Sequence, residues 1–130
     1  VYEEPYKNIA IELFGRGDAY EILKTKGLVY FMTTSFIRGV TIQDSVILID
    51  ECQNMSFHEL DSIITRVGQG CRVIFSGDFR QADLAKNGLK DFIRVLKAMD
   101  KFDLIDFEIK DIVRSDFVKQ YITAKTELGL

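Results

Sequence analysis

A continuous aliphatic run, Val46–Ile49, most constrains how this chain folds, because it ends abruptly at two adjacent carboxylates. A run of that kind, bounded by polar residues, is typical of a strand buried on both faces of a sheet. A second run, Arg72–Phe75, with Val73 and Ile74 at its centre, predicts the next buried strand and ends at Ser76-Gly77-Asp78. The segment between them has helical spacing, so the two runs predict a βαβ unit with parallel strands and a right-handed crossover.

The rest of the chain alternates helical and strand-like patterns. Ser56 and Glu59 have the spacing of a capping box, as do Asp18 and Glu21, so each pair predicts the start of a helix. We expect helices at 6–14, 18–26, 56–67, 89–99 and 115–122, a loop at 33–44, and further strands at 28–32 and 102–109. This order predicts an α/β fold, a mostly parallel sheet flanked by helices, with ligands at the carboxyl ends of the strands.

Composition bounds the class of protein. The 130 residues fit a single domain, 1–130, and a hydrophobic fraction of 47% is enough for a core. A net charge of −3 excludes a strongly basic nucleic-acid clamp but leaves room for a local basic groove. No apolar run is long enough to cross a membrane, so we expect no membrane partner. Two cysteines do not make a disulfide scaffold and indicate a reducing, cytoplasmic setting.

Asp50 and Glu51 stand at the end of the first aliphatic run and project to opposite sides of the predicted strand. One carboxylate can hold Mg²⁺, directly or through water, because Mg²⁺ prefers oxygen ligands and keeps several waters. The other can orient a water aimed at a γ-phosphate, which is the arrangement of a Walker B motif. The same two residues also suit a solvated strand end or a helix N-terminus, and taken alone they leave both interpretations open.

Gly77, Asp78 and Gln81 follow the second run. Gly77 lets the backbone come close to a ligand, and an amide on this turn can contact a phosphate or its attacking water. Because parallel strands end at the same edge of a sheet, we expect these residues to lie beside Asp50 and Glu51. An ordinary turn explains Gly77 and Asp78 equally well without their neighbours.

Several motifs, taken in order over residues 28–122, resemble the PhoH-like family of phosphate-starvation-inducible ATPases. They are Phe36-Ile37-Arg38-Gly39-Val40-Thr41, Ile47-Leu48-Ile49-Asp50-Glu51-Cys52-Gln53-Asn54, Thr65-Arg66-Val67-Gly68, Gly77-Asp78, Gln81-Ala82-Asp83-Leu84 and Asp111-Ile112-Val113-Arg114-Ser115. Superfamily 1 helicase cores are similar more widely, since their Asp-Glu-x-Gln and Gly-Asp-x-x-Gln motifs stand in this order.

The resemblance implies a RecA-like P-loop core that binds ATP and Mg²⁺, hydrolyses ATP, has a connection with RNA and forms ring-like homo-oligomers. It implies Asp50 as the Mg²⁺ residue and Glu51 as the catalytic base. It also implies Gln81 as a γ-phosphate sensor supported by Asp78, with Gly77 and Asp78 among the residues that bind the nucleotide. Carried over in the same way, Arg38 and Arg114 are candidates for contact with a phosphate, within one subunit or across a subunit interface.

Two features depart from the family pattern. Cys52 stands where the family usually has alanine, a change that a buried position tolerates. More important, no Gly-x-x-x-x-Gly-Lys-Ser/Thr motif occurs in the chain, so the loop that cradles the β- and γ-phosphates is missing. We therefore expect the C-terminal portion of such a domain, with a sheet incomplete at its N-terminal side, in a chain that begins at Val1 as a fragment.

Two other functions remain open from the sequence. Without the phosphate-binding loop, the chain suits a non-catalytic nucleotide-fold module that binds nucleic acid or a protein partner. Three acidic residues at the strand ends, Asp50, Glu51 and Asp78, would also suit a metal-dependent nuclease. The aliphatic strand and Gln81 fit the nuclease less well.

Overall fold

Two short parallel strands organise the first part of the chain. β1 (Val46–Ile49) pairs with β2 (Arg72–Phe75), with Ile47 opposite Val73 and Ile49 opposite Phe75. The computed structural model describes residues 1–78 and 88–130. Its chain divides into two units, 1–93 and 94–130, which we describe separately. The predicted parallel pair joined through a helix is confirmed, and with it the α/β class.

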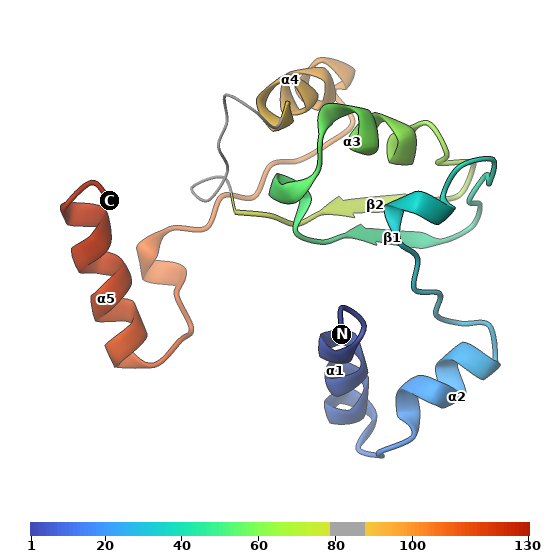
Figure 1. Ribbon diagram of the computed structural model, residues 1–130, viewed down its shortest axis with the longest axis horizontal. Coiled ribbons are helices and arrows are strands. Elements are labelled where there is room, and N and C mark those ends of the chain that lie inside the picture. Colours follow the sequence, from blue (N-terminus) through green and yellow to red (C-terminus); the bar gives the residue numbers. More distant parts are fainter. Residues whose placement is uncertain (79–87) are drawn as a thin grey trace. The chain divides into compact units, whose positions relative to one another are not determined.

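The connection between the strands is α3 (Phe57–Ile64), which covers one face of the pair (Figure 1). The predicted capping box is present: the Ser56 hydroxyl accepts the Glu59 backbone N–H, and the Glu59 carboxylate accepts the Ser56 N–H. Leu60 and Ile63 are buried on the inner side of α3. The apolar spacing of this helix therefore places the core of the first unit between α3 and the strands.

Aromatic rings extend this core to the start of α4 (Leu89–Met99). The ring of Phe92 meets Phe75 of β2 edge-on, with centroids 5.2 Å apart, and meets Phe57 of α3 at 6.3 Å. Such tilted contacts are the preferred geometry of aromatic pairs. Leu89 and Phe92 are buried, so the first turn of α4 belongs to the same core as α3.

The opposite face of the strand pair is largely bare among the described residues. Val46, Leu48 and Ile74 have 68%, 54% and 51% of their surface exposed. The prediction that the first strand is buried on both faces is therefore wrong for this chain. Its aliphatic composition is that of a doubly covered strand, but only the side facing α3 is covered here.

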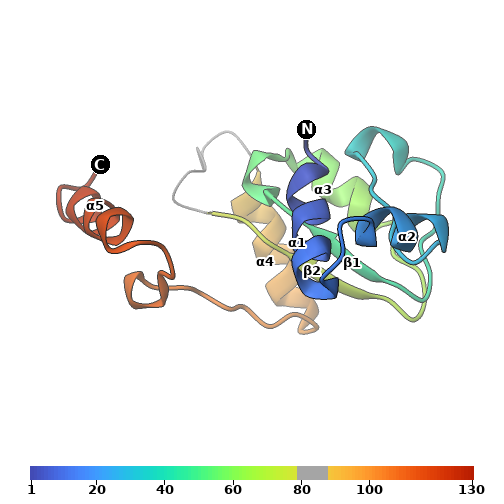
Figure 2. The same ribbon diagram turned by 90° about the horizontal axis from the view of Figure 1, so that it is seen from below.

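A helical hairpin forms from α1 (Glu4–Phe14) and α2 (Ala19–Thr25), on the side of the sheet away from α3 (Figures 1 and 2). It has its own small core of Ala10, Ala19 and Tyr20. The capping box predicted at Asp18 does not form, because the Asp18 carboxylate pairs instead with the guanidinium of Arg16. The charged neighbour competes successfully for the oxygens that would have capped α2.

Two predicted strands are not present. Residues 28–32 and 102–109 are irregular, apart from Ile109, which begins the short 3₁₀ helix η3 (Ile109–Asp111). The described residues contain one sheet, of two strands. Apolar and β-branched side chains make a segment compatible with a strand, but a partner backbone is needed to form one. In the predicted loop 33–44 the structure has a further 3₁₀ helix, η1 (Thr34–Phe36).

The second unit, 94–130, holds the remainder of α4, η3 and α5 (Asp116–Glu127). The Ser115 hydroxyl accepts the Val118 N–H at 3.4 Å, which confirms the predicted start of the last helix. In the described ranges, 1–78 and 88–130, every helix is too short or too polar to cross a bilayer.

Candidate functional site

The ends of β1 and β2 lie side by side, as the sequence predicts. The parallel hydrogen-bond ladder continues past both strands: the Ser76 N–H donates to the Ile49 carbonyl at 2.8 Å, and the Cys52 N–H donates to the Ser76 carbonyl at 3.0 Å. Asp50 and Glu51 are thereby held next to the turn at Gly77. This edge, where the carboxyl ends of parallel strands meet, is where ligands bind in sheets of this type.

Glu51 has an unusual backbone conformation. Its φ of 53° is in the left-handed region, which costs a non-glycine residue roughly 1–2 kcal/mol. The chain turns here from β1 into the 3₁₀ helix η2 (Cys52–Asn54). The neighbouring Asp50 helps to hold the turn, since its Oδ1 accepts the Glu51 N–H at 3.0 Å. Strained residues of this kind cluster at functional sites, so the conformation marks Glu51 as a candidate.

Gln53 joins the two strand ends through its buried side chain, which is 5% exposed. Its Nε2 donates to Oε2 of Glu51, and its Oε1 accepts the Asp78 backbone N–H at 3.1 Å. An amide buried in this way is stabilising only if its polar atoms are paired. The contacts therefore tie the carboxylate after β1 to the turn after β2.

Gly77 is glycine because of a close approach rather than a special φ. A Cβ at this position would lie 2.7 Å from the Cys52 sulfur and 2.7 Å from Oε1 of Gln53. Cys52 is buried, and its burial raises the pKa of the thiol, so it acts as a small apolar residue beneath the turn. Both cysteines of the chain are free.

Tyr6 of α1 reaches the same edge from the hairpin. Its hydroxyl donates to Oδ2 of Asp50 at 2.7 Å, and its ring lies 5.9 Å from that of Phe31. Burial, together with the hydrogen bond to the Asp50 carboxylate, raises the pKa of Tyr6 to about 12. The phenol is therefore neutral, and available as a donor to Asp50, at physiological pH.

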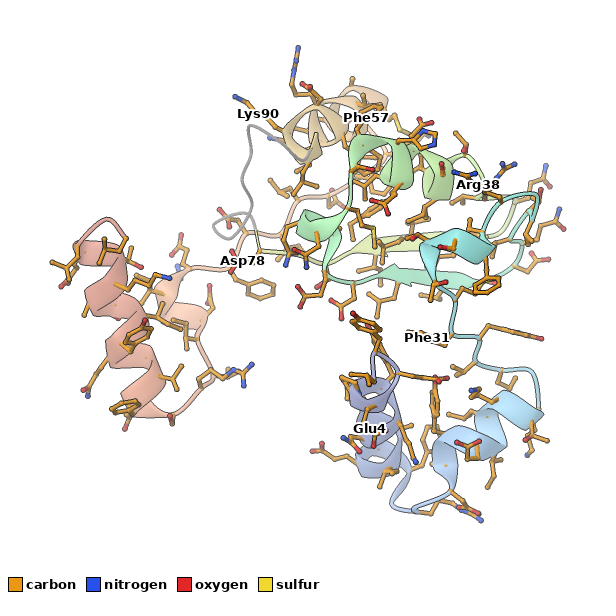
Figure 3. All side chains as sticks on the ribbon, viewed as in Figure 1. Glu4, Phe31, Arg38, Phe57, Asp78 and Lys90 are labelled. Atoms are coloured by element: carbon orange, nitrogen blue, oxygen red, sulfur yellow. The ribbon has the colours of Figure 1, made fainter. Side chains whose placement is uncertain are left out.

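Of the other residues predicted from the sequence, Arg38 lies away from this edge. Arg38 lines a shallow depression beside η1 and α3, together with His58 and Ser62, and Figure 3 shows it at the far end of the strand pair from Asp78. Arg114 belongs to the second unit, and Gln81 lies outside the described residues. Among the predicted site residues of the described part of the first unit, the structure brings together Asp50, Glu51, Gly77 and Asp78.

The donor set suits Mg²⁺ better than a metal held by protein groups alone. In the part of the chain that is described, no three His, Cys, Asp or Glu side chains converge to hold an ion. Mg²⁺ is commonly bound through one or two carboxylates, with waters and substrate phosphates completing its octahedron. Asp50 offers such a carboxylate, whereas a two-metal nuclease site would need more ligands than these residues supply.

Sequence reasoning missed two residues of this edge, Gln53 and Tyr6. Gln53 follows Glu51 by two positions and belongs to the motif 47–54 quoted above. Its closeness to Glu51 along the chain could therefore have identified it as a site residue. Tyr6 is 44 residues away from Asp50 along the chain, and no local pattern links them.

Comparison with known proteins shows one family. The model of the family described as "PhoH-like protein" matches residues 2–126. A PhoH-like protein of Bacillus subtilis (strain 168) is 30% identical over 126 residues, which is 95% of this chain. Protein PhoH of Escherichia coli (strain K12) is 26% identical over 127 residues, and Protein PhoH2 of Bacillus subtilis is 39% identical over 67 residues, or 52% of this chain.

These relatives are much longer than the chain. The match covers 39% of the Bacillus PhoH-like protein, 36% of the Escherichia protein and 15% of PhoH2. The 130 residues therefore correspond to a part of each relative, and residues 2–126, which match the family model, include both strand ends.

The crowding at Gly77 predicts a large loss of stability for Gly77→Ala. The added methyl group would displace the Cys52 sulfur and the Gln53 amide, so we expect the free energy of unfolding to fall by about 1–3 kcal/mol. Gly17→Ala is the matched control, since a Cβ there has no atom within 4 Å, and it should stay within about 0.5 kcal/mol of wild type. Urea denaturation measures both; equal effects of the two variants would contradict the close approach.

The Tyr6 phenol predicts a pH dependence of stability. A pKa raised from 10.0 to about 12 stabilises the fold below pH 10, and this contribution is lost as the pH rises through 12. In urea denaturation at stepped pH, the stability advantage of wild type over Tyr6→Phe should therefore shrink between pH 10 and 12. Tyr2→Phe, at a tyrosine 83% exposed, should follow the wild-type curve. A constant difference between wild type and Tyr6→Phe would rule this coupling out.

Proposed function

This chain belongs to the PhoH-like family, and from that premise we propose that it supplies the magnesium-binding and water-orienting carboxylates of an ATPase with a RecA-like P-loop core. The observation that carries the proposal is the pair Asp50 and Glu51, fixed at the end of β1 beside the end of β2. The left-handed conformation of Glu51 and the buried amide that holds its carboxylate add support.

In this proposal Asp50 would hold Mg²⁺, and the ion would supply positive charge that neutralises the charge developing on the phosphates of ATP. An ionised carboxylate has about four lone-pair positions. The bonds that Asp50 accepts from Tyr6 and from the Glu51 backbone therefore leave positions for a Mg²⁺-bound water. The chain's role is to keep this carboxylate oriented at a rigid strand end.

Glu51 is the proposed catalytic base. Its carboxylate is exposed at the strand end and Oε2 is bound by Gln53. In this proposal Oε1 would orient an attacking water toward the γ-phosphate. The turn at Gly77 and Asp78 lies next to Glu51 at the strand ends. Gln81 is the proposed γ-phosphate sensor, and Arg38 or Arg114 the proposed arginine that contacts a phosphate, from the same subunit or a neighbouring one.

We further propose that the whole protein couples ATP hydrolysis to binding or remodelling of RNA or another nucleic acid, as a homo-oligomeric ring in the cytoplasm. The order of motifs shared with helicase cores supports this coupling. An arginine donated across a subunit interface would then stabilise the charge that develops during phosphoryl transfer.

Turnover of ATP by the whole polypeptide that carries these residues tests the proposal. Asp50→Asn and Glu51→Gln keep side-chain volume but remove the charge and the base, so we expect each to lower kcat by about 10²-fold or more. Asp61→Asn and Glu12→Gln make the same changes at exposed helix positions and should leave kcat unchanged. Unchanged hydrolysis in Asp50→Asn and Glu51→Gln would remove the assignment.

One observation favours a second function, a non-catalytic module that binds nucleic acid or a protein partner. The chain has no Gly-Lys-Ser/Thr loop, and such a loop supplies most of the grip on the phosphates. We therefore expect the 130 residues alone to bind ATP weakly in a calorimetric titration with Mg²⁺. Tight binding would show that the strand ends suffice and would exclude this alternative.

A further inference from the structure

Gln53 is the buried polar residue at the centre of the site. We propose that it is a positioning residue, which fixes the Glu51 carboxylate for water activation and links it to the turn at Gly77 and Asp78. The inference rests on the proposed function, because it assumes that Glu51 orients the attacking water.

The contacts of Gln53 define one orientation of its amide. The carboxylate of Glu51 accepts hydrogen bonds and the backbone N–H of Asp78 donates one. With the amide rotated by half a turn, an oxygen would face the carboxylate and an NH₂ group would face the N–H, so both contacts would become repulsive. The two partners therefore fix the orientation of the Gln53 amide, and burial raises the free energy of the reversed orientation.

A held carboxylate matters because Glu51 is otherwise exposed. A glutamate at the surface has three side-chain torsions and samples many positions. The Gln53 amide fixes one oxygen and leaves the other for a water molecule. Misplacing a reacting group by about 1 Å can cost on the order of 10²-fold in rate, so an anchor of this kind acts on kcat.

The same amide also links the end of β1 to the turn after β2. Oε1 of Gln53 binds the Asp78 backbone, and Gly77 allows the turn to approach Gln53 so closely that no Cβ fits. A shift of the turn after β2 therefore moves the amide and, through it, the Glu51 carboxylate. The parallel backbone bond from Cys52 to Ser76 keeps the two segments in register.

The first test is the hydrogen bond itself, measured by NMR on the full chain without nucleotide. The Gln53 side-chain amide should exchange with solvent more slowly than that of Gln69, an exposed glutamine, on the order of tenfold or more. Glu51→Ala should shift the Gln53 amide resonances and leave those of Gln69 in place. An amide that exchanges as fast as Gln69, or does not respond to Glu51→Ala, overturns the inference.

The second test is Gln53→Glu in the ATP-hydrolysing whole protein. Glutamate has the same shape and still accepts the Asp78 N–H, but it presents an oxygen to Glu51 in place of the donor. We expect kcat to fall about 10- to 100-fold, with KM for ATP within about threefold of wild type. Gln69→Glu, the matched charge change on an exposed loop, should retain wild-type kcat and KM.

The outcomes separate this inference from the proposed function. If wild type hydrolyses ATP and Gln53→Glu has the wild-type kcat, whether or not its KM for ATP is raised, the positioning role is wrong while the proposed function stands. If the NMR bond is present and wild type does not hydrolyse ATP, the proposed function fails and the positioning role fails with it. The amide measurement needs no Gln53 variant, so a fast-exchanging Gln53 amide overturns the inference even where Gln53→Glu does not fold.

Discussion

The parallel pairing of β1 with β2 is the interaction on which the rest of the site depends. Its backbone bonds do not stop with the strands but run on through Ser76 and Cys52, past the last aliphatic residue. Two polar turns are thereby brought together from segments separated by α3. The contacts through Gln53 and around Gly77 use that register, since a slip by one residue would point each side chain to the other face.

Much of the first unit could be predicted from the chain because its signals are local. The runs 46–49 and 72–75 predicted both strands, and Ser56 with Glu59 predicted the start of α3. Asp18 with Glu21 has the same spacing and failed, since Arg16 lies two residues away and takes the carboxylate. A capping residue can also bond to charged neighbours, and the capping-box spacing does not show whether such a neighbour takes its carboxylate.

The errors share a different cause, which is the dependence of a strand on backbone far along the chain. Residues 28–32 have suitable side chains, yet they pair with no strand in the described ranges. The same non-local dependence hides Tyr6, whose bond to Asp50 joins positions 44 residues apart. Asp50, Glu51, Gly77 and Asp78 were accessible to sequence reasoning because each directly follows a recognisable strand, and the family match includes them all.

The left-handed backbone at Glu51 lowers the stability of the fold at a residue that carries a carboxylate. Glycine adopts φ near 53° with little strain, so the fold alone would favour glycine at this position. Glu51 therefore keeps a carboxylate at the cost of backbone strain, and Asp44 and Asp100 are the other non-glycine residues with a positive φ in the described part of the chain. Selection for thermal stability alone would therefore favour glycine at position 51, and the more stable protein that results would lack the carboxylate.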